Sequence, residues 1–185
     1  MQQKVCVFCA ASEDCDSFYL DEAYKLGKYL AQTGRDIVYG GGRVGLMGRL
    51  ADGALSCGGR VTGVIPTFMY DSDLGHPDIT ETIVVNNMHS RKLKMYEESC
   101  SIIALPGGIG TIDELIEALC WKRLGILFSP VIIVNINKYF DPLIEMLDKT
   151  IKYNFTPIEY AHSWLTVDSV DEALEYLNYL NPVSK

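Results

Sequence analysis

The chain has 185 residues, of which 48% are hydrophobic and 22% charged, and this near-average globular composition excludes a largely disordered protein. Since a domain ordinarily takes about 100–200 residues, we expect residues 1–185 to form a single domain. With 16 Lys and Arg against 24 Asp and Glu, the formal net charge is −8, which argues against a nucleic-acid polymer as partner but not against a small phosphorylated ligand.

Strands and helices are expected to alternate along the chain. Apolar runs of strand length cover residues 5–10, 36–39, 61–65, 79–85, 101–105, 131–135 and 164–167. Amphipathic segments of helix length cover residues 17–33, 46–57, 88–99, 111–125, 142–153 and those from 168 onward. The clearest apolar stripes are Tyr19, Ala23, Leu26 and Leu30, ended by Gly34, and Val170, Ala173, Leu174 and Leu177. Residues 67–78 are polar and irregular, which predicts a loop or a short helix.

The expected strands are mostly continuous apolar runs rather than alternating ones, as a parallel sheet buried on both faces requires. Together with the alternation of strands and helices, this predicts an α/β fold with a doubly wound, mostly parallel sheet flanked by helices on both faces. Ligands of such sheets bind at the carboxyl ends of the strands, near the point where the strand order reverses. A functional site is therefore expected in the loops that follow the strands.

The first such loop is rich in glycine. Residues 40–48 read Gly-Gly-Gly-Arg-Val-Gly-Leu-Met-Gly, five glycines in nine positions. Without Cβ atoms, successive N–H groups can turn towards one anion, and the helix that follows adds partial positive charge. The alternative is a tight turn that needs glycine for packing alone. The loop lacks the Gly-Lys-Ser/Thr of a Walker A motif.

A second glycine loop runs from Pro106 to Glu114 and reads Pro-Gly-Gly-Ile-Gly-Thr-Ile-Asp-Glu. The hydroxyl of Thr111 is suited to cap the following helix or to bind a phosphate oxygen. Glu114 lies one turn into that helix. It is either an ordinary charge near a helix N-terminus or a carboxylate aimed at the ligand.

Two cations, Arg91 and Lys92, come at the start of the helix expected over residues 88–99, within the sequence Met88-His89-Ser90-Arg91-Lys92. Cations at a helix N-terminus oppose the helix dipole, so an anionic partner would explain them. The alternative is a pair of solvated surface charges.

Neither a metal site nor a membrane partner is expected. No apolar run reaches the roughly 18 residues of a membrane span, and the run 5–11 is too short for a signal sequence. Cys6 and Cys9 have C-x-x-C spacing, but residues three apart on a strand point to opposite faces. The two thiols are therefore not expected to share a metal ion or to form a redox pair. The irregular spacing of the six cysteines favours reduced thiols in a cytoplasmic protein.

Taken together, the three motifs resemble those of the Lonely Guy (LOG) family of cytokinin riboside 5′-monophosphate phosphoribohydrolases, often labelled "possible lysine decarboxylase". The resemblance runs from Val5 to about Phe155. It implies a Rossmann-like fold and hydrolysis of the N-glycosidic bond of a nucleoside 5′-monophosphate, such as AMP or isopentenyladenosine monophosphate, without a cofactor. It also implies a homodimer whose subunits together complete the site.

The resemblance assigns roles by position. Arg91 and Glu114 match the family's catalytic Arg and Glu. The matching substrate-binding positions are Ser12, Gly41, Gly42, Met47, Gly48, Asp73, Met88, Lys92, Gly107, Gly108, Ile109, Gly110, Thr111 and Cys120. We expect Glu114 to stabilise positive charge that develops on the ribose, and Arg91 to orient the substrate and keep that carboxylate ionised. The two glycine loops are expected to anchor the 5′-phosphate.

The chain departs from the family's pattern at four places, which bear on base preference more than on the reaction. Residues 9–12 read Cys-Ala-Ala-Ser in place of Cys-Gly-Ser-Ser, Cys120 replaces a frequent Thr, Asp113 replaces the first Glu of a pair, and Asn87 replaces Asp. Two alternatives stay open: an AMP nucleosidase without cytokinin specificity, and a nucleotide-binding or sensing module without turnover. A pyridoxal-phosphate decarboxylase is disfavoured, because no lysine here has a recognisable cofactor-binding context.

Overall fold

The computed structural model describes residues 3–180, and within that range seven parallel strands form one sheet in the order β4-β3-β2-β1-β5-β6-β7. The strands are β1 (Lys4–Phe8), β2 (Asp36–Tyr39), β3 (Val61–Pro66), β4 (Glu81–Val85), β5 (Ser101–Ala104), β6 (Val131–Val134) and β7 (Leu165–Val167). The α-helices are α1 (Ser17–Gln32), α2 (Gly45–Leu55), α3 (Thr67–Tyr70), α4 (Met88–Glu97), α5 (Ile109–Arg123), α6 (Asp141–Lys152) and α7 (Val170–Leu180). Two 3-10 helices, η1 (Ile136–Lys138) and η2 (Ile158–His162), flank α6.

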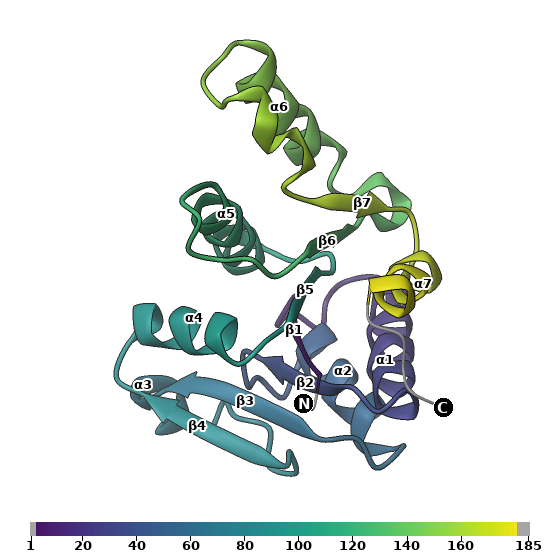
Figure 1. Ribbon diagram of the computed structural model, residues 1–185. Coiled ribbons are helices and arrows are strands. Elements are labelled where there is room, and N and C mark those ends of the chain that lie inside the picture. The colour runs from purple at the N-terminus through teal and green to yellow at the C-terminus, as the bar shows by residue number, and fades with distance from the viewer. Residues whose placement is uncertain (1–2, 181–185) are drawn as a thin grey trace.

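Helices cover both faces of the sheet (Figure 1). Helices α1, α2 and α7 pack on the face that carries Val5, Val7 and Cys9, whereas α4, α5 and α6 pack on the face that carries Cys6 and Phe8. The predicted doubly wound parallel sheet is therefore confirmed. The two cysteines of the C-x-x-C spacing belong to opposite faces, as the alternation of side chains along a strand predicts.

The predicted helical stripes are confirmed in most positions. All four apolar residues of the α7 stripe are buried, as are Ala23, Leu26 and Leu30 of α1, while Tyr19 is only half-buried. The chain leaves α1 through Gly34, whose φ of 70° is a left-handed conformation that suits glycine. Residues 67–78 combine the two alternatives, because the short helix α3 is followed by a turn.

Two glycines allow α1 and α2 to approach each other closely. A Cβ at Gly27 would lie 2.0 Å from the backbone oxygen of Leu50, and one at Gly53 would lie 2.1 Å from the backbone oxygen of Tyr24. Neither contact can be relieved by rotating a side chain, because both atoms belong to the backbone of the facing helix. A larger residue at either position must therefore push the two helices apart.

Gly27→Ala is expected to lower the free energy of unfolding by about 2–3 kcal/mol, the effect of overpacking a tight core. The matched control is Gly110→Ala in α5, where a Cβ would meet no atom within 4 Å among the described residues. That control should cause no loss, since alanine is favoured over glycine inside a helix by about 0.5–1 kcal/mol. Urea unfolding of both variants measures the difference. Equal losses would contradict the close approach of α1 and α2.

Candidate active site

A cavity of about 330 Å³ lies at the carboxyl ends of β1 and β5. These strands are neighbours in the sheet, but the chain proceeds from β1 towards β2 and returns to β5 on the other side, so they mark the point where the strand order reverses. The volume falls within the range of about 300–1,000 Å³ that is usual for small-molecule sites. The lining residues are Cys9, Ala10, Ala11, Ser12, Met47, Met69, Met88, Arg91, Gly108, Gly110, Thr111 and Glu114.

The structure thus brings together eight of the predicted site residues, from four separate parts of the chain. These are Ser12, Met47, Met88, Arg91, Gly108, Gly110, Thr111 and Glu114. Met69, which reaches the cavity from α3, was not among the predicted site residues. Nothing in the irregular segment 67–78 singles out this methionine, and only the fold brings it to the same cavity as Met47 and Met88.

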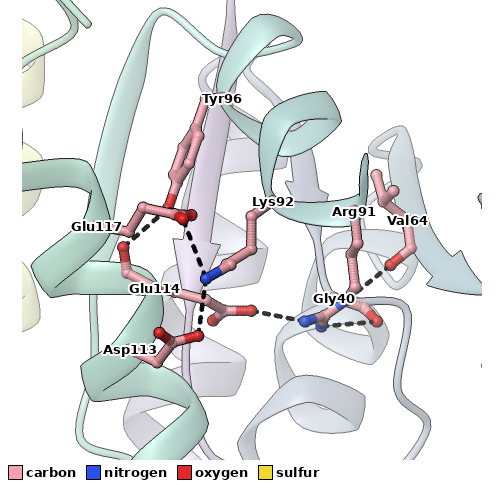
Figure 2. A network of polar contacts seen from close by, with 8 residues as sticks. All are labelled: Gly40, Val64, Arg91, Lys92, Tyr96, Asp113, Glu114 and Glu117. Carbon is pink, nitrogen blue, oxygen red and sulfur yellow. Dashed lines mark hydrogen bonds and ion pairs between the residues drawn. The ribbon is translucent and has the colours of Figure 1, made fainter. Parts of the chain in front are cut away.

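Arg91 is buried and held by backbone oxygens of β3 and of the loop that follows β2. Its Nε donates to the oxygen of Val64 at 3.0 Å and its Nη2 to the oxygen of Gly40 at 3.2 Å, while Nη1 donates to Oε1 of Glu114 at 2.7 Å (Figure 2). A guanidinium has five N–H donors, so donors remain for a ligand. Asn87 helps to place this residue, because its side chain caps α4 by accepting from the N–H of Ser90 at 2.9 Å.

Glu114 is 3% exposed and pairs with Arg91 through one oxygen, Oε1. No hydrogen bond within residues 3–180 reaches Oε2, which leaves that oxygen for a ligand in the cavity. Burial raises the pKa of the Glu114 carboxyl, and although Arg91 acts to lower it, burial outweighs the guanidinium. The expectation that Arg91 keeps this carboxylate ionised is therefore only partly met, because Arg91 limits the rise in pKa without reversing it.

The N-terminus of α5 opens onto the cavity. Gly108 is the N-cap residue, and no side chain caps the helix, so the first N–H groups of α5 are free of side-chain partners among the described residues. A Cβ at Gly108 or Gly110 would meet no atom within 4 Å in the described part of the chain. Packing within the protein therefore does not require glycine at these two positions, and the open space lies where a ligand would meet the helix.

The first glycine loop differs, because neighbouring protein atoms fill the space around its glycines. A Cβ at Gly40 would lie 1.9 Å from Nη2 of Arg91, and one at Gly48 would lie 2.2 Å from the backbone oxygen of Arg43. Gly41 and Gly42 meet the turn after α3, where Gly42 forms an antiparallel bridge with Gly75. The packing alternative thus accounts for much of this loop. Met47 is its residue that lines the cavity, and Gly40 acts on the site only through its contact with Arg91.

Five other predicted residues do not line the cavity. Lys92 pairs with carboxylates of α5, Asp73 pairs with Arg43 on the surface, and Gly107 accepts a hydrogen bond from the hydroxyl of Tyr139 at 2.6 Å. Ile109 is 87% exposed. Cys120 lies further along α5 and lines a separate groove against α6 and η2.

The buried cations exclude the alternative of solvated surface charges. Arg91 is 4% and Lys92 6% exposed, and the anionic partners that the structure gives them are carboxylates of α5.

Other kinds of chemistry find no support at the cavity. Burial raises the pKa of the Cys9 thiol well above its ordinary value, so Cys9 lines the cavity as a neutral thiol and not as a thiolate nucleophile. Within residues 3–180 no cluster of three or more His, Cys, Asp or Glu is arranged to hold a metal ion. Among the helices of that range, none has the length and apolar character needed to cross a membrane.

Comparison with known sequences points to one family. The family model described as "Possible lysine decarboxylase" matches residues 47–177. A protein of Oryza sativa subsp. japonica named "Probable cytokinin riboside 5′-monophosphate phosphoribohydrolase LOGL9" is 37% identical over 181 residues, 98% of this chain and 80% of that protein. A protein of Arabidopsis thaliana named "Cytokinin riboside 5′-monophosphate phosphoribohydrolase LOG5" is 35% identical over 182 residues, again 98% and 80% of the two chains.

Comparison with solved structures supports the fold. A molybdenum cofactor carrier protein from Chlamydomonas reinhardtii has a TM-score of 0.74 at 21% identity, covering 97% of this chain and 98% of that one. A molybdenum cofactor binding protein from Rippkaea orientalis has a TM-score of 0.73 at 22% identity, with the same coverage. At such low identity the likeness concerns the fold alone.

Proposed function

This chain belongs to the family described as possible lysine decarboxylase, and from that membership and the names of its relatives we propose that it hydrolyses the N-glycosidic bond of a nucleoside 5′-monophosphate. The products are the free base and ribose 5-phosphate. Cytokinin nucleotides are the substrate class that the relatives' names indicate.

The observation that carries the proposal is the buried pair of Arg91 and Glu114 in a cavity at the switch point of the sheet. Breaking the bond between C1′ and the base builds positive charge on the ribose, as in other glycoside hydrolyses. The Glu114 carboxylate is placed to stabilise that charge through Oε2 and to accept a proton from the attacking water. Arg91 holds Glu114 through Oε1 and keeps N–H donors for the substrate.

The N-terminus of α5 is the proposed anchor of the 5′-phosphate. Free N–H groups and the positive end of the helix dipole suit an anion there, and Thr111 adds a hydroxyl beside them. Binding of the phosphate, which does not react, then positions C1′ against Glu114. Met47, Met69 and Met88 form the apolar part of the wall, which suits the base and an apolar substituent on it.

The test is a product assay. The purified protein is incubated with AMP, with isopentenyladenosine monophosphate and with adenosine, and the free base and ribose 5-phosphate are quantified. We expect turnover of at least one monophosphate and little or none of adenosine, because adenosine lacks the anchor. Tight binding of both monophosphates without product would contradict hydrolysis and favour the nucleotide-sensing module. Preference for AMP over the isopentenyl compound would favour the AMP nucleosidase.

A decarboxylase is tested in the same preparation. The protein is incubated with lysine and pyridoxal phosphate, and carbon dioxide release and the absorbance of a bound cofactor are followed. We expect neither signal, because Lys92, which follows the cavity residue Arg91 on α4, is engaged in ion pairs with α5. A bound-cofactor band together with carbon dioxide release would revive the decarboxylase.

The proposal includes a cytosolic homodimer, with each chain forming one domain. Two observations support a second subunit at the site. Ile109 is 87% exposed between two cavity residues, and Cys120 lies outside the cavity of its own chain. Light scattering during size exclusion at assay concentrations is expected to give twice the mass of one chain. A monomer with full activity would contradict the shared site.

A further inference from the structure

Lys92, the second buried cation of α4, does not line the cavity. Its Nζ lies 2.9 Å from Oδ2 of Asp113 and 3.2 Å from Oε1 of Glu117, both on α5. Figure 2 draws these two ion pairs as dashed lines. Only 8% of its side chain is exposed. A contact with the substrate phosphate would require this buried ammonium to leave both ion pairs. The geometry thus gives Lys92 an internal role.

The two partners of Lys92 flank Glu114 along α5. Asp113 precedes it, and Glu117 follows almost one turn later. Asp113 and Glu117 are four residues apart, so their carboxylates lie on one side of the helix and repel each other. The ammonium of Lys92 lies between them and offsets that repulsion. It therefore fixes the beginning of α5 against α4.

Tyr96, one turn after Lys92 on α4, contacts the same part of α5. Its hydroxyl lies 2.9 Å from the backbone oxygen of Glu114 and 3.1 Å from Oε2 of Glu117 (Figure 2), and it donates to one of them at a time. Burial raises the pKa of Tyr96, so the hydroxyl stays a neutral donor. The backbone that carries the Glu114 side chain is thus held from α4 by a hydroxyl as well as by the ammonium.

We propose that Lys92, assisted by Tyr96, is a positioning residue for Glu114 and does not contact the substrate phosphate. The proposal rests on the function proposed above, since it takes Glu114 as the reacting carboxylate. Lys92 acts in two ways: it holds α5 in register with α4, and its positive charge compensates Asp113 beside Glu114.

Charged and titratable groups from three elements surround Glu114. They are Arg91, Lys92 and Tyr96 on α4, Asp113 and Glu117 on α5, and Cys6 and Cys9 in and after β1. Arg91 and Lys92 lower the pKa of Glu114 and Asp113 raises it, while burial keeps both thiols neutral. Loss of the Lys92 ammonium should therefore raise the pKa of Glu114, and loss of the Asp113 charge should lower it.

The test compares Lys92→Met with Lys92→Arg and with the double variant Lys92→Met/Asp113→Asn. The matched control is Lys94→Met, which removes a lysine of α4 that pairs with Glu98 at 2.7 Å, away from Glu114. Two readouts are taken: the pH titration of the Glu114 carboxyl by ¹³C NMR without substrate, and kcat and KM for AMP across pH.

We expect Lys92→Met to move the Glu114 titration and the acid limb of kcat/KM upward by about one pH unit. At neutral pH kcat should fall about tenfold, while KM changes by less than about threefold. In the double variant, the midpoints of the Glu114 titration and of the acid limb should return towards those of the parent protein. Neither midpoint should move in Lys92→Arg or in Lys94→Met. Asp113→Asn alone should move the midpoint downward, so the test remains decisive if Lys92→Met does not fold.

If the KM of Lys92→Met rises about tenfold or more while the acid limb of kcat/KM stays where it is, the proposal is overturned and Lys92 is a substrate contact. An unmoved Glu114 titration in both Lys92→Met and Asp113→Asn would also overturn it. If the parent protein releases no ribose 5-phosphate, the proposed function fails. The NMR titration, which needs no turnover, then still decides whether Lys92 controls Glu114.

Discussion

Glu114→Gln is expected to lower kcat about 10³-fold or more while the protein stays folded and binds nucleotide. Glutamine has nearly the same shape, and its amide oxygen can still accept from Nη1 of Arg91, which lies 2.7 Å from Oε1 in the parent protein. What the variant loses is the negative charge facing C1′ and the ability to accept a proton from water. Steady-state kinetics with AMP, thermal unfolding and nucleotide binding separate these effects.

The control for this variant is Glu145→Gln on α6, whose carboxylate is exposed and pairs with Lys149. It should retain full activity. Turnover of Glu114→Gln within about tenfold of the parent protein would remove Glu114 from the reaction.

The pH dependence follows from the same carboxyl group. Burial raises the pKa of Glu114, and the reaction requires its ionised form. Activity of the parent protein should therefore decline as the pH falls through a midpoint above the ordinary range of a glutamate. The residual activity of Glu114→Gln should lack this acid limb. An acid limb unchanged by the substitution would assign the titration to another group.

Gly40→Ala is expected to lower kcat/KM about a hundredfold, because it displaces Arg91 from its position. The new Cβ would lie 1.9 Å from Nη2 and 3.1 Å from Cζ of Arg91. The guanidinium cannot stay in place, yet it is the group that holds Glu114. The loss of fit should also lower the free energy of unfolding by about 1–3 kcal/mol.

Gly75→Ala is the matched control, since among residues 3–180 its Cβ would meet Cδ1 of Ile65 alone, at an ordinary 3.6 Å. Michaelis constants and urea unfolding of the two alanine variants measure the contrast. Gly40→Ala with the kcat/KM of the parent protein would show that the position of Arg91 is not critical.

The fold was accessible from the sequence because local patterns determine it. The stripe Val170, Ala173, Leu174 and Leu177 is buried as predicted, and the continuous apolar strands form the parallel sheet. Such patterns record which side of an element faces the core, and that is enough to specify layers and strand type.

The site was accessible only in part, because its details depend on how distant elements pack. The cations of α4 indicated an anionic partner, but not that Arg91 turns to Glu114 while Lys92 turns to Asp113 and Glu117. That Cys120 lies outside the cavity could have been predicted, however. Cys120 follows Glu114 by six positions, which on an α-helix puts the two side chains roughly 120° apart around the axis.

Helix α3 carries no buried residue, although its Met69 lines the cavity. Substitutions there cost little folding free energy, because no core contact is lost. Arg91, in contrast, is bonded to the backbone at Val64 and Gly40, so changes to it disturb fold and chemistry together. Substitutions in α3 can therefore change which base the protein prefers, while Arg91 and Glu114 stay the same. Relatives with different base preferences should differ in α3 first.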